Sequence, residues 1–251
     1  MKNNHNRIVI KQGSSFFDKK LYHRKEAIGR MATQVKGLKN QGHSISIVHS
    51  GAVVEGKRRF EQMEMSSDNV SPNVLAAMGG AGIAENIWLE LMVRRMFSAQ
   101  MLVTHSEMNN PKHLESILTT MESMEKSDVI PLINANDALE LEELQKLPSG
   151  GDNDQLAAEI AGHWGAHTLL LCTDVDGFMV NGEVQKQVSV SDIDSLQEHI
   201  YEPSKNGTGS MHSKLQAAAY AARMGINAVI GHAEADYQQI INNQIGTQVV
   251  Q

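Results

Sequence analysis

Residues 150–158 read Gly150-Gly151-Asp152-Asn153-Asp154-Gln155-Leu156-Ala157-Ala158. Short polar residues and glycines favour a helix start, because their side chains satisfy the free N–H groups of the first turn. The Ala-rich continuation predicts a helix over residues 155–161. Capping needs only one of Asp152, Asn153 and Asp154. We therefore expect the others to serve a site at this helix N-terminus, which is a favourable place for an anion.

Predicted strands lie on both sides of this helix, at residues 129–134 and 168–172. The first ends at Asn134 and is followed by Asp137, and the second is followed by Thr173 and Asp174. Outward along the chain, strands and helices are predicted to alternate. This alternation indicates an α/β fold with a mainly parallel sheet covered by helices on both faces. In such sheets, ligands bind beyond the carboxyl ends of the strands.

The remaining elements are predicted from apolar runs and from helical spacing. We expect strands at residues 7–11, 44–48, 101–104 and 227–230, and helices at residues 26–39, 111–125 and 215–224. Residues 57–71 are polar and Met-rich, which predicts a loop or mobile element. Residues 73–101 predict helix with an interruption near Gly79-Gly80-Ala81-Gly82. Because no repeat, low-complexity tract or linker is evident, one domain is expected over residues 1–251.

Composition excludes several classes of partner. The formal net charge of −7 argues against nucleic acid and anionic membranes as partners. No apolar run approaches the length of a membrane span, and the N-terminus lacks the apolar stretch of a signal peptide. The single cysteine, Cys172, lies in an apolar run, where we interpret it as a small buried hydrophobic residue. These features predict a soluble, cytoplasmic protein.

Two lysines are candidates for contact with phosphate. Gly207-Thr208-Gly209-Ser210-Met211-His212-Ser213-Lys214 precedes a predicted helix, and its N–H groups can face phosphate oxygens. Lys214 would lie in the first turn, where a positive charge is unfavourable unless an anion neutralises it. Lys11 ends a predicted strand just before Gly13-Ser14-Ser15, which could also wrap an anion. Taken singly, each could instead be an ordinary solvated lysine or loop.

A third glycine-containing segment, residues 51–58, nearly matches a Walker A loop. Its last position must be Ser or Thr to hold magnesium, and here it is Arg58. The apolar helix that should follow is also not evident. We interpret this match as a coincidence.

Several motifs occur together in one order along the chain. That order resembles the glutamate 5-kinases, a branch of the amino acid kinase family, over nearly the whole chain. The closing Ile245-Gly246-Thr247 also resembles the end of their kinase domain. The motifs are Ile10-Lys11-Gln12-Gly13-Ser14-Ser15, Ser50-Gly51-Ala52-Val53, Ile133-Asn134-Ala135-Asn136-Asp137, Gly151-Asp152-Asn153-Asp154, Thr173-Asp174-Val175-Asp176-Gly177 and the 207–214 loop.

The resemblance implies a three-layer αβα sandwich and ATP-dependent phosphorylation of the γ-carboxylate of L-glutamate, with Mg²⁺ bridging the phosphates. It implies that Lys11, Lys214 and Asp154 are catalytic, with Asp154 orienting the two lysines. Glutamate would be bound by Ser50, Gly51, Asn134, Asp137 and Asn153. The nucleotide would be bound by Lys11, Gly13, Thr173, Asp174, Gly207, Thr208, Gly209, Ser210, Met211 and Lys214, and no side chain is expected to ligate a metal.

The resemblance also implies a homo-oligomer, either a dimer or a tetramer, in a single-domain form without the RNA-binding-like PUA domain of many bacterial members. Two residues near the acceptor depart from the family pattern. Ala135 replaces a usual glutamate, and His49 stands where serine is common. They leave open a kinase of the same fold that acts on another carboxylate or a phosphonate. A catalytically idle amino-acid-binding module is a further alternative, although pure binding would not need Lys11, Asp154 and Lys214 together.

Overall fold

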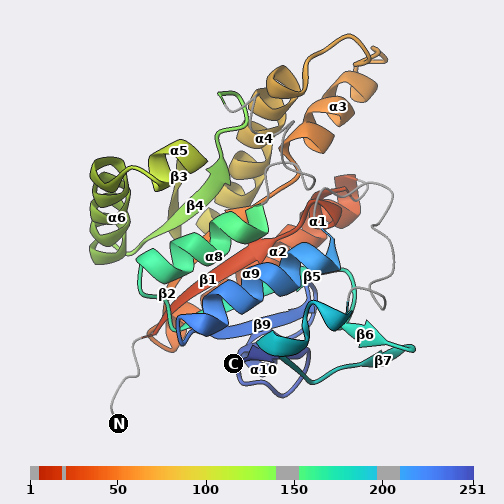
Figure 1. The fold of residues 1–251 in the computed structure, drawn as a ribbon. Helices are drawn as coiled ribbons and strands as arrows, with labels where there is room; N and C mark the ends of the chain where they lie inside the picture. The colour runs from red at the N-terminus through yellow and green to blue at the C-terminus, as the bar shows by residue number, and fades with distance from the viewer. Residues whose placement is uncertain (1–5, 19–20, 140–152, 197–209) are drawn as a thin grey trace.

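The computed structural model describes residues 6–18, 21–139, 153–196 and 210–251. Within these residues an eight-stranded sheet forms the centre of the molecule, with strand order β3-β4-β2-β1-β5-β9-β10-β8 (Figure 1). All neighbouring strands are parallel except β9 and β10, which are antiparallel. The strands are β1 (Arg7–Gln12), β2 (Ser44–His49), β3 (Phe97–Val103), β4 (Val129–Ala135), β5 (Thr168–Thr173), β8 (Gln187–Ser189), β9 (Asn227–His232) and β10 (Thr247–Val250).

The central strands are buried on both faces, as in other parallel sheets covered by helices. All six residues of β2 and all six of β5 are buried. Ile10 of β1 pairs with Ile47 of β2 on one side and with Leu170 of β5 on the other. The predicted mainly parallel sheet is thereby confirmed.

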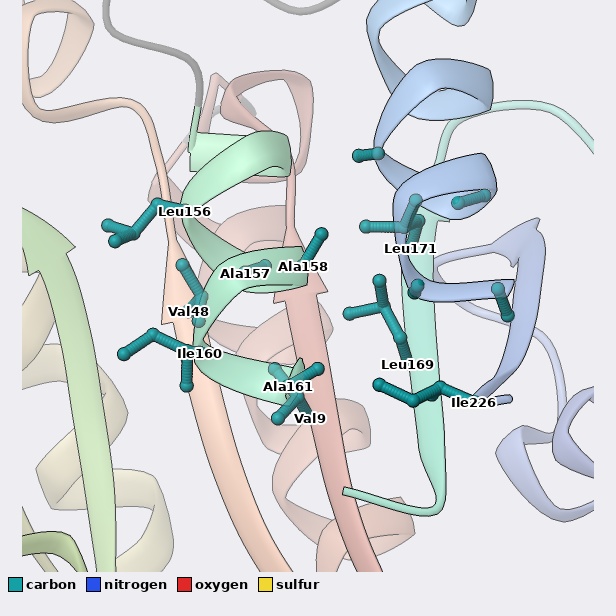
Figure 2. Close-up of a cluster of buried hydrophobic side chains, with 14 of the residues drawn as sticks. Val9, Val48, Leu156, Ala157, Ala158, Ile160, Ala161, Leu169, Leu171 and Ile226 are labelled. Atoms are coloured by element: carbon teal, nitrogen blue, oxygen red, sulfur yellow. The ribbon is translucent and has the colours of Figure 1, made fainter. Parts of the chain in front are cut away.

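Helices cover both faces of the sheet, which gives the three-layer sandwich. One face is covered by helices that include α2 (Leu21–Asn40), α4 (Pro72–Val93) and α10 (Tyr237–Ile241), with the four-residue α1 (Ser14–Phe17) beside them. The opposite face carries α6 (Pro111–Lys126), α8 (Asn153–His163) and α9 (Met211–Arg223). Figure 2 shows side chains of α8, Leu156 and Ile160 among them, over Val48 of β2.

Short elements connect these layers. Helix α5 (His105–Met108) begins in a reciprocal capping box between Thr104 and Glu107. The hairpin of β6 (Met179–Val180) and β7 (Glu183–Val184) lies apart from the main sheet and is followed, after β8, by the 3₁₀ turn η1 (Val190–Asp192). No helix in the described ranges is both long enough and apolar enough to cross a membrane.

Two sequence predictions about residues 51–101 need correction. Helix α3 (Ala52–Gln62) extends into the segment predicted as a loop and takes residues 57–62 of it, whereas residues 63–71 form turns and irregular structure. The Walker-like residues lie in α3, so they form no phosphate loop. Helix α4 runs through its glycines without interruption, and β3 begins at Phe97 where helix was predicted. A Cβ on Gly79 would lie 1.9 Å from Ala52 O, and one on Gly56 would lie 2.1 Å from Leu75 O. The glycines therefore serve the close packing of α3 against α4.

Helix α3 is also held to the body of the protein by charge. Glu55 is buried and forms ion pairs with the buried Arg24 of α2 and with Arg58, the latter at 2.5 Å. Burial of the Arg24 guanidinium is the main cause of its lowered pKa; the Glu55 carboxylate opposes this shift, and the charge of Arg58 adds to it. A carboxylate shared between arginines explains why a polar-looking stretch of sequence is an ordered helix.

Candidate active site

The polar residues that follow the parallel strands gather at one edge of the sheet. Lys11 lies near the end of β1, Ser50 follows β2, Asn134 lies near the end of β4 and Thr173 ends β5. Because these four strands are parallel neighbours in the sheet, their carboxyl ends meet. The sequence predicted a site at the carboxyl ends of the strands, and these polar residues lie at that edge of the sheet.

Three charged residues far apart in the sequence meet in a buried cluster, which we call the lysine triad: Lys11, Asp154 and Lys214. Lys11 Nζ lies 2.5 Å from Asp154 Oδ1, and Lys214 Nζ donates to Asp154 Oδ2 at 3.0 Å. Their exposed fractions are 2%, 0% and 5%, so the charges are almost fully removed from water. The predicted convergence of the two lysines on Asp154 is present in the structure.

Local structure explains how the triad is positioned. Asp154 lies in the first turn of α8, where the helix N-terminus favours a negative charge. Lys214 lies in the first turn of α9, where the helix N-terminus opposes a positive charge. Because α8 packs against α9, Asp154 compensates that unfavourable placement. Two lysines with one carboxylate nevertheless leave one positive charge in excess.

Ser213 completes this cluster; the sequence placed it only within the 207–214 loop and did not assign it a contact with Asp154. Its hydroxyl donates to Asp154 Oδ2 at 3.1 Å. Its backbone N–H donates to the side chain of Ser210, the N-cap residue of α9. The signal for it was the N-cap spacing from Ser210 to Ser213, which fixes the first turn of α9.

The ionisation of Asp154 follows from these contacts. Burial of the carboxyl group raises its pKa, but the charges of Lys11 and Lys214 oppose burial and outweigh it. The net result is a pKa well below the usual range, so Asp154 is a carboxylate at neutral pH.

A second group of polar residues, which we call the amide end, comprises Ser50, Gly51, Asn134, Asp137 and Asn153. Asn153 Oδ1 accepts a hydrogen bond from the backbone N–H of Ala135 at 3.2 Å, which joins the start of α8 to the end of β4. Gly51 has a φ of 93°, a left-handed conformation that favours glycine. Asn134 is 2% exposed, and within the described residues its Oδ1 has no hydrogen-bond partner.

The two departures from the family pattern are both buried. The ring of His49 packs edge-on against Phe17 at 6.2 Å between centroids. Burial lowers the pKa of His49 to about 4, and the nearby Ser50 backbone only partly opposes this shift. The Ala135 methyl belongs to the core cluster under α8. Either residue therefore affects the amide end through packing.

The predicted nucleotide residues are placed in part. Thr173 Oγ1 donates to Asp174 Oδ1 at 3.2 Å at the end of β5, Gly13 precedes α1, and Ser210 and Met211 begin α9. Gly207, Thr208 and Gly209 lie outside the described residues, as do Gly150, Gly151 and Asp152. A cavity of about 400 Å³ beside the ends of β5 and β9 is lined in part by Asp176, Lys186, His232 and Gly246. Asp176 and Gly246 belong to the family motifs, whereas the sequence did not single out Lys186 or His232.

The cysteine interpretation is confirmed. Cys172 is fully buried, and burial raises its pKa to about 12, so its thiol stays protonated. The buried Gln12 side chain donates to both Cys172 Sγ and Tyr237 Oη. This network joins β1, the strand that carries Lys11, to β5 and α10.

Comparison with known sequences assigns the family. A model of the amino acid kinase family matches residues 6–232. The chain belongs to this family. It is 32% identical over 223 residues to a glutamate 5-kinase of Enterococcus faecalis, which covers 84% of this chain and 81% of that enzyme. The similarity to glutamate 5-kinases expected from the motifs is thereby confirmed.

Other relatives are longer than the region that this chain matches. Glutamate 5-kinases of Acinetobacter baylyi and Thermotoga maritima are 32% and 31% identical to it. The matches cover 92% and 89% of this chain, but only 62% of each relative.

Solved structures show the same fold at low sequence identity. Carbamate kinase from Giardia lamblia bound to AMP-PNP superposes with a TM-score of 0.71 at 13% identity and covers 99% of both chains. N-acetylglutamate synthase from Neisseria gonorrhoeae has a TM-score of 0.69 at 13% identity and covers 98% of this chain and 59% of the other. The chain therefore shares its fold with these two structures.

Proposed function

We propose that the chain catalyses ATP-dependent phosphorylation of the γ-carboxylate of L-glutamate to L-glutamyl 5-phosphate, the first step of proline biosynthesis. The observation that carries this proposal is the lysine triad, which holds an excess positive charge at the carboxyl edge of the sheet. The similarity to glutamate 5-kinases supports the choice of acceptor.

A carboxylate acceptor simplifies the chemistry. The side chain of free glutamate has an ordinary pKa of about 4.3, so it is already ionised at neutral pH and needs no general base. The difficulty is to bring this anion up to a polyphosphate and to stabilise the charge on the transferring group. Lys11 and Lys214 would contact that group from two sides. Asp154, which accepts a hydrogen bond from Ser213, holds both lysine ammonium groups in position.

The nucleotide would bind on the β5 and β9 side of the triad. Its phosphates would meet the N-terminus of α9, where Ser210, Met211 and Lys214 lie. The cavity beside Asp176 and His232 has space for part of the nucleoside. We propose that residues Gly207–Gly209 also bind the nucleotide, as the family motif implies.

Magnesium is expected to accompany the nucleotide, where it neutralises phosphate charge. No group of three or more His, Cys, Asp or Glu in the described ranges is arranged to hold a metal ion. Asp154 is already engaged by two lysines. We therefore propose that phosphate oxygens are the main ligands of Mg²⁺, which prefers oxygen and keeps several waters.

The amide end would bind the acceptor. Asp137 would pair with the α-ammonium, while Ser50, Gly51, Asn134 and Asn153 would hold the carboxylates. A second candidate function is phosphorylation of another carboxylate or of a phosphonate, because Ala135 removes a carboxylate that the family pattern places here. We also expect a homo-oligomer of the chain, which stays a prediction.

The test is a panel of acids offered with ATP and Mg²⁺. Carboxyl phosphates are trapped as hydroxamates, and release of ADP is measured in parallel to detect a phosphonate acceptor, which yields no hydroxamate. We expect L-glutamate to give the highest kcat/KM. If another acid gives a higher kcat/KM, that acid and not L-glutamate is the acceptor. If no acid causes ADP release, the result contradicts kinase activity and favours a catalytically idle binding module.

A further inference from the structure

Helix α4 places one buried side chain against the turn that follows β4. Asn73, the second residue of α4, is 9% exposed. Its Nδ2 donates to the backbone oxygen of Asp137 at 3.0 Å and, more weakly, to that of Ala138 at 3.4 Å. These partners are 64 and 65 positions away in the sequence. Asn73 is thus a clamp on the turn that carries Asp137.

The oxygen of the same amide group makes no hydrogen bond to the described residues. Asn73 Oδ1 is buried and has no hydrogen-bond partner within the described residues. A buried polar atom without a partner costs about 1–3 kcal/mol, so such atoms usually mark a missing water or ligand. Because Nδ2 and Oδ1 belong to one planar amide, Oδ1 lies beside the same Asp137 turn.

The same face of α4 continues toward the amide end. Gly80 lies seven residues after Asn73, close to two helical turns, so both residues share one face of the helix. A Cβ built on Gly80 would lie 3.6 Å from Asn134 Nδ2 and 3.6 Å from the Ala52 Cβ. Helix α4 therefore runs along Asn134 and Asp137, two residues to which the proposed function gives acceptor contacts.

We propose that Asn73 is a positioning and specificity-determining residue of the acceptor site. Its Nδ2 holds the Asp137 turn in place, and its Oδ1 accepts a hydrogen bond from the α-ammonium of the acceptor. This inference rests on the proposed kinase function and narrows the acceptor to a carboxylic acid that carries an amino group.

Charge supports an ammonium at this position. The N-terminus of α4 carries roughly +0.5 of an elementary charge, which by itself opposes an ammonium. The acidic side chain of Asp137 belongs to the clamped turn, and the Asn73 oxygen presents the negative end of its amide dipole, so both groups favour a cation here.

The experiment compares L-glutamate with glutarate, which lacks the ammonium, in the wild type and in Asn73→Ala. We expect the KM for glutamate to rise about tenfold, with kcat within threefold and the KM for ATP within twofold of wild type. The kcat/KM for glutarate should change less than threefold, so the preference for glutamate over glutarate falls.

Asn86→Ala is the matched control. Asn86 is also an asparagine of α4, and its Nδ2 donates to Gly82 O at 2.7 Å, within the helix. This variant should leave the KM for glutamate, the kcat, the KM for ATP and the kcat/KM for glutarate unchanged. Should Asn73→Ala not be recovered folded, Asn73→Ser removes the same amide with a smaller loss of volume and replaces it.

The outcomes separate the two proposals. If the wild type phosphorylates no acid in the panel, the proposed function fails. If the wild type is active but Asn73→Ala keeps its glutamate KM, or loses glutamate and glutarate activity equally, the inference about Asn73 is wrong.

Discussion

At the lysine triad, both carboxylate oxygens of the buried Asp154 are engaged by lysine ammonium groups before any substrate arrives. At the amide end, by contrast, Asn73 Oδ1 and Asn134 Oδ1 are buried without partners in the part of the chain that the structure describes. The first region is electrostatically preorganised, and the second has polar atoms that a ligand could satisfy. We infer that the triad governs turnover and the amide end governs acceptor choice.

The variant Lys214→Met most directly tests whether the lysine triad governs turnover. Removing one of the two cations should leave Asp154 paired with Lys11, so the fold should persist. The kcat should fall by about 10²–10³-fold, as when one preorganised group at a transition state is lost.

Lys39→Met is the matched control for Lys214→Met, because Lys39 lies in the last turn of α2 and forms an ion pair with Asp128, the residue that precedes β4. Steady-state rates and circular dichroism measure both variants. Near-normal turnover in Lys214→Met would remove this lysine from the mechanism.

Asp154→Asn should show the next largest effect. A neutral amide cannot balance two buried ammonium groups, so Lys11 and Lys214 should shift apart. We expect kcat to fall by about tenfold to a hundredfold and the KM for glutamate to change less than threefold, together with a lower melting temperature. A large rise in KM at normal kcat would assign Asp154 to the acceptor instead.

The stability of the amide end should depend on pH through His49. Its folded pKa of about 4 lies below the unfolded value of 6.5, so the unfolded chain binds more protons between these values. The neutral ring stabilises the fold fully above pH 6.5, and this contribution is lost as pH falls toward 4. The loss from this group alone should be about 2 kcal/mol between pH 8 and pH 5.

Denaturant unfolding of His49→Leu at both pH values measures this contribution. The wild type should lose about 2 kcal/mol more than the variant over this range. Equal losses would show that His49 does not set the pH dependence.

The smallest effect is expected at Gly80→Ala. The new methyl group would meet Asn134 and Ala52 at ordinary contact distances, and alanine favours a helix by up to about 1 kcal/mol over glycine. We expect unchanged or higher stability and a glutamate KM raised about threefold by the narrower acceptor end.

Gly79→Ala provides the contrast to Gly80→Ala, because its Cβ would collide with Ala52 O and should destabilise the α3–α4 pair. Thermal unfolding and steady-state kinetics measure both variants. A destabilised Gly80→Ala, or an unaffected Gly79→Ala, would contradict this assignment of the two adjacent glycines.

Much of the fold follows from local sequence. The apolar runs that became β1, β4 and β5 are nearly continuous, because both faces of these strands are buried. Lys11, Asn134 and Thr173 could be placed at one edge because parallel strands share a direction. The unfavourable position of Lys214 at a helix start indicated an anion nearby, and Asp154 occupies part of that role.

Only the tertiary structure decided how α3 and α4 pack and what Asn73 contacts. The glycines of α4 predicted an interruption of the helix. In the structure α4 is continuous, and its glycines allow the α3 backbone to approach closely. The sequence predicted only that Asn73 begins a helix. In the structure its side-chain amide donates a hydrogen bond to a turn 64 positions later in the chain. Local propensity depends on neighbours in the chain, but a hydrogen bond or a backbone clash depends on which segments meet in space.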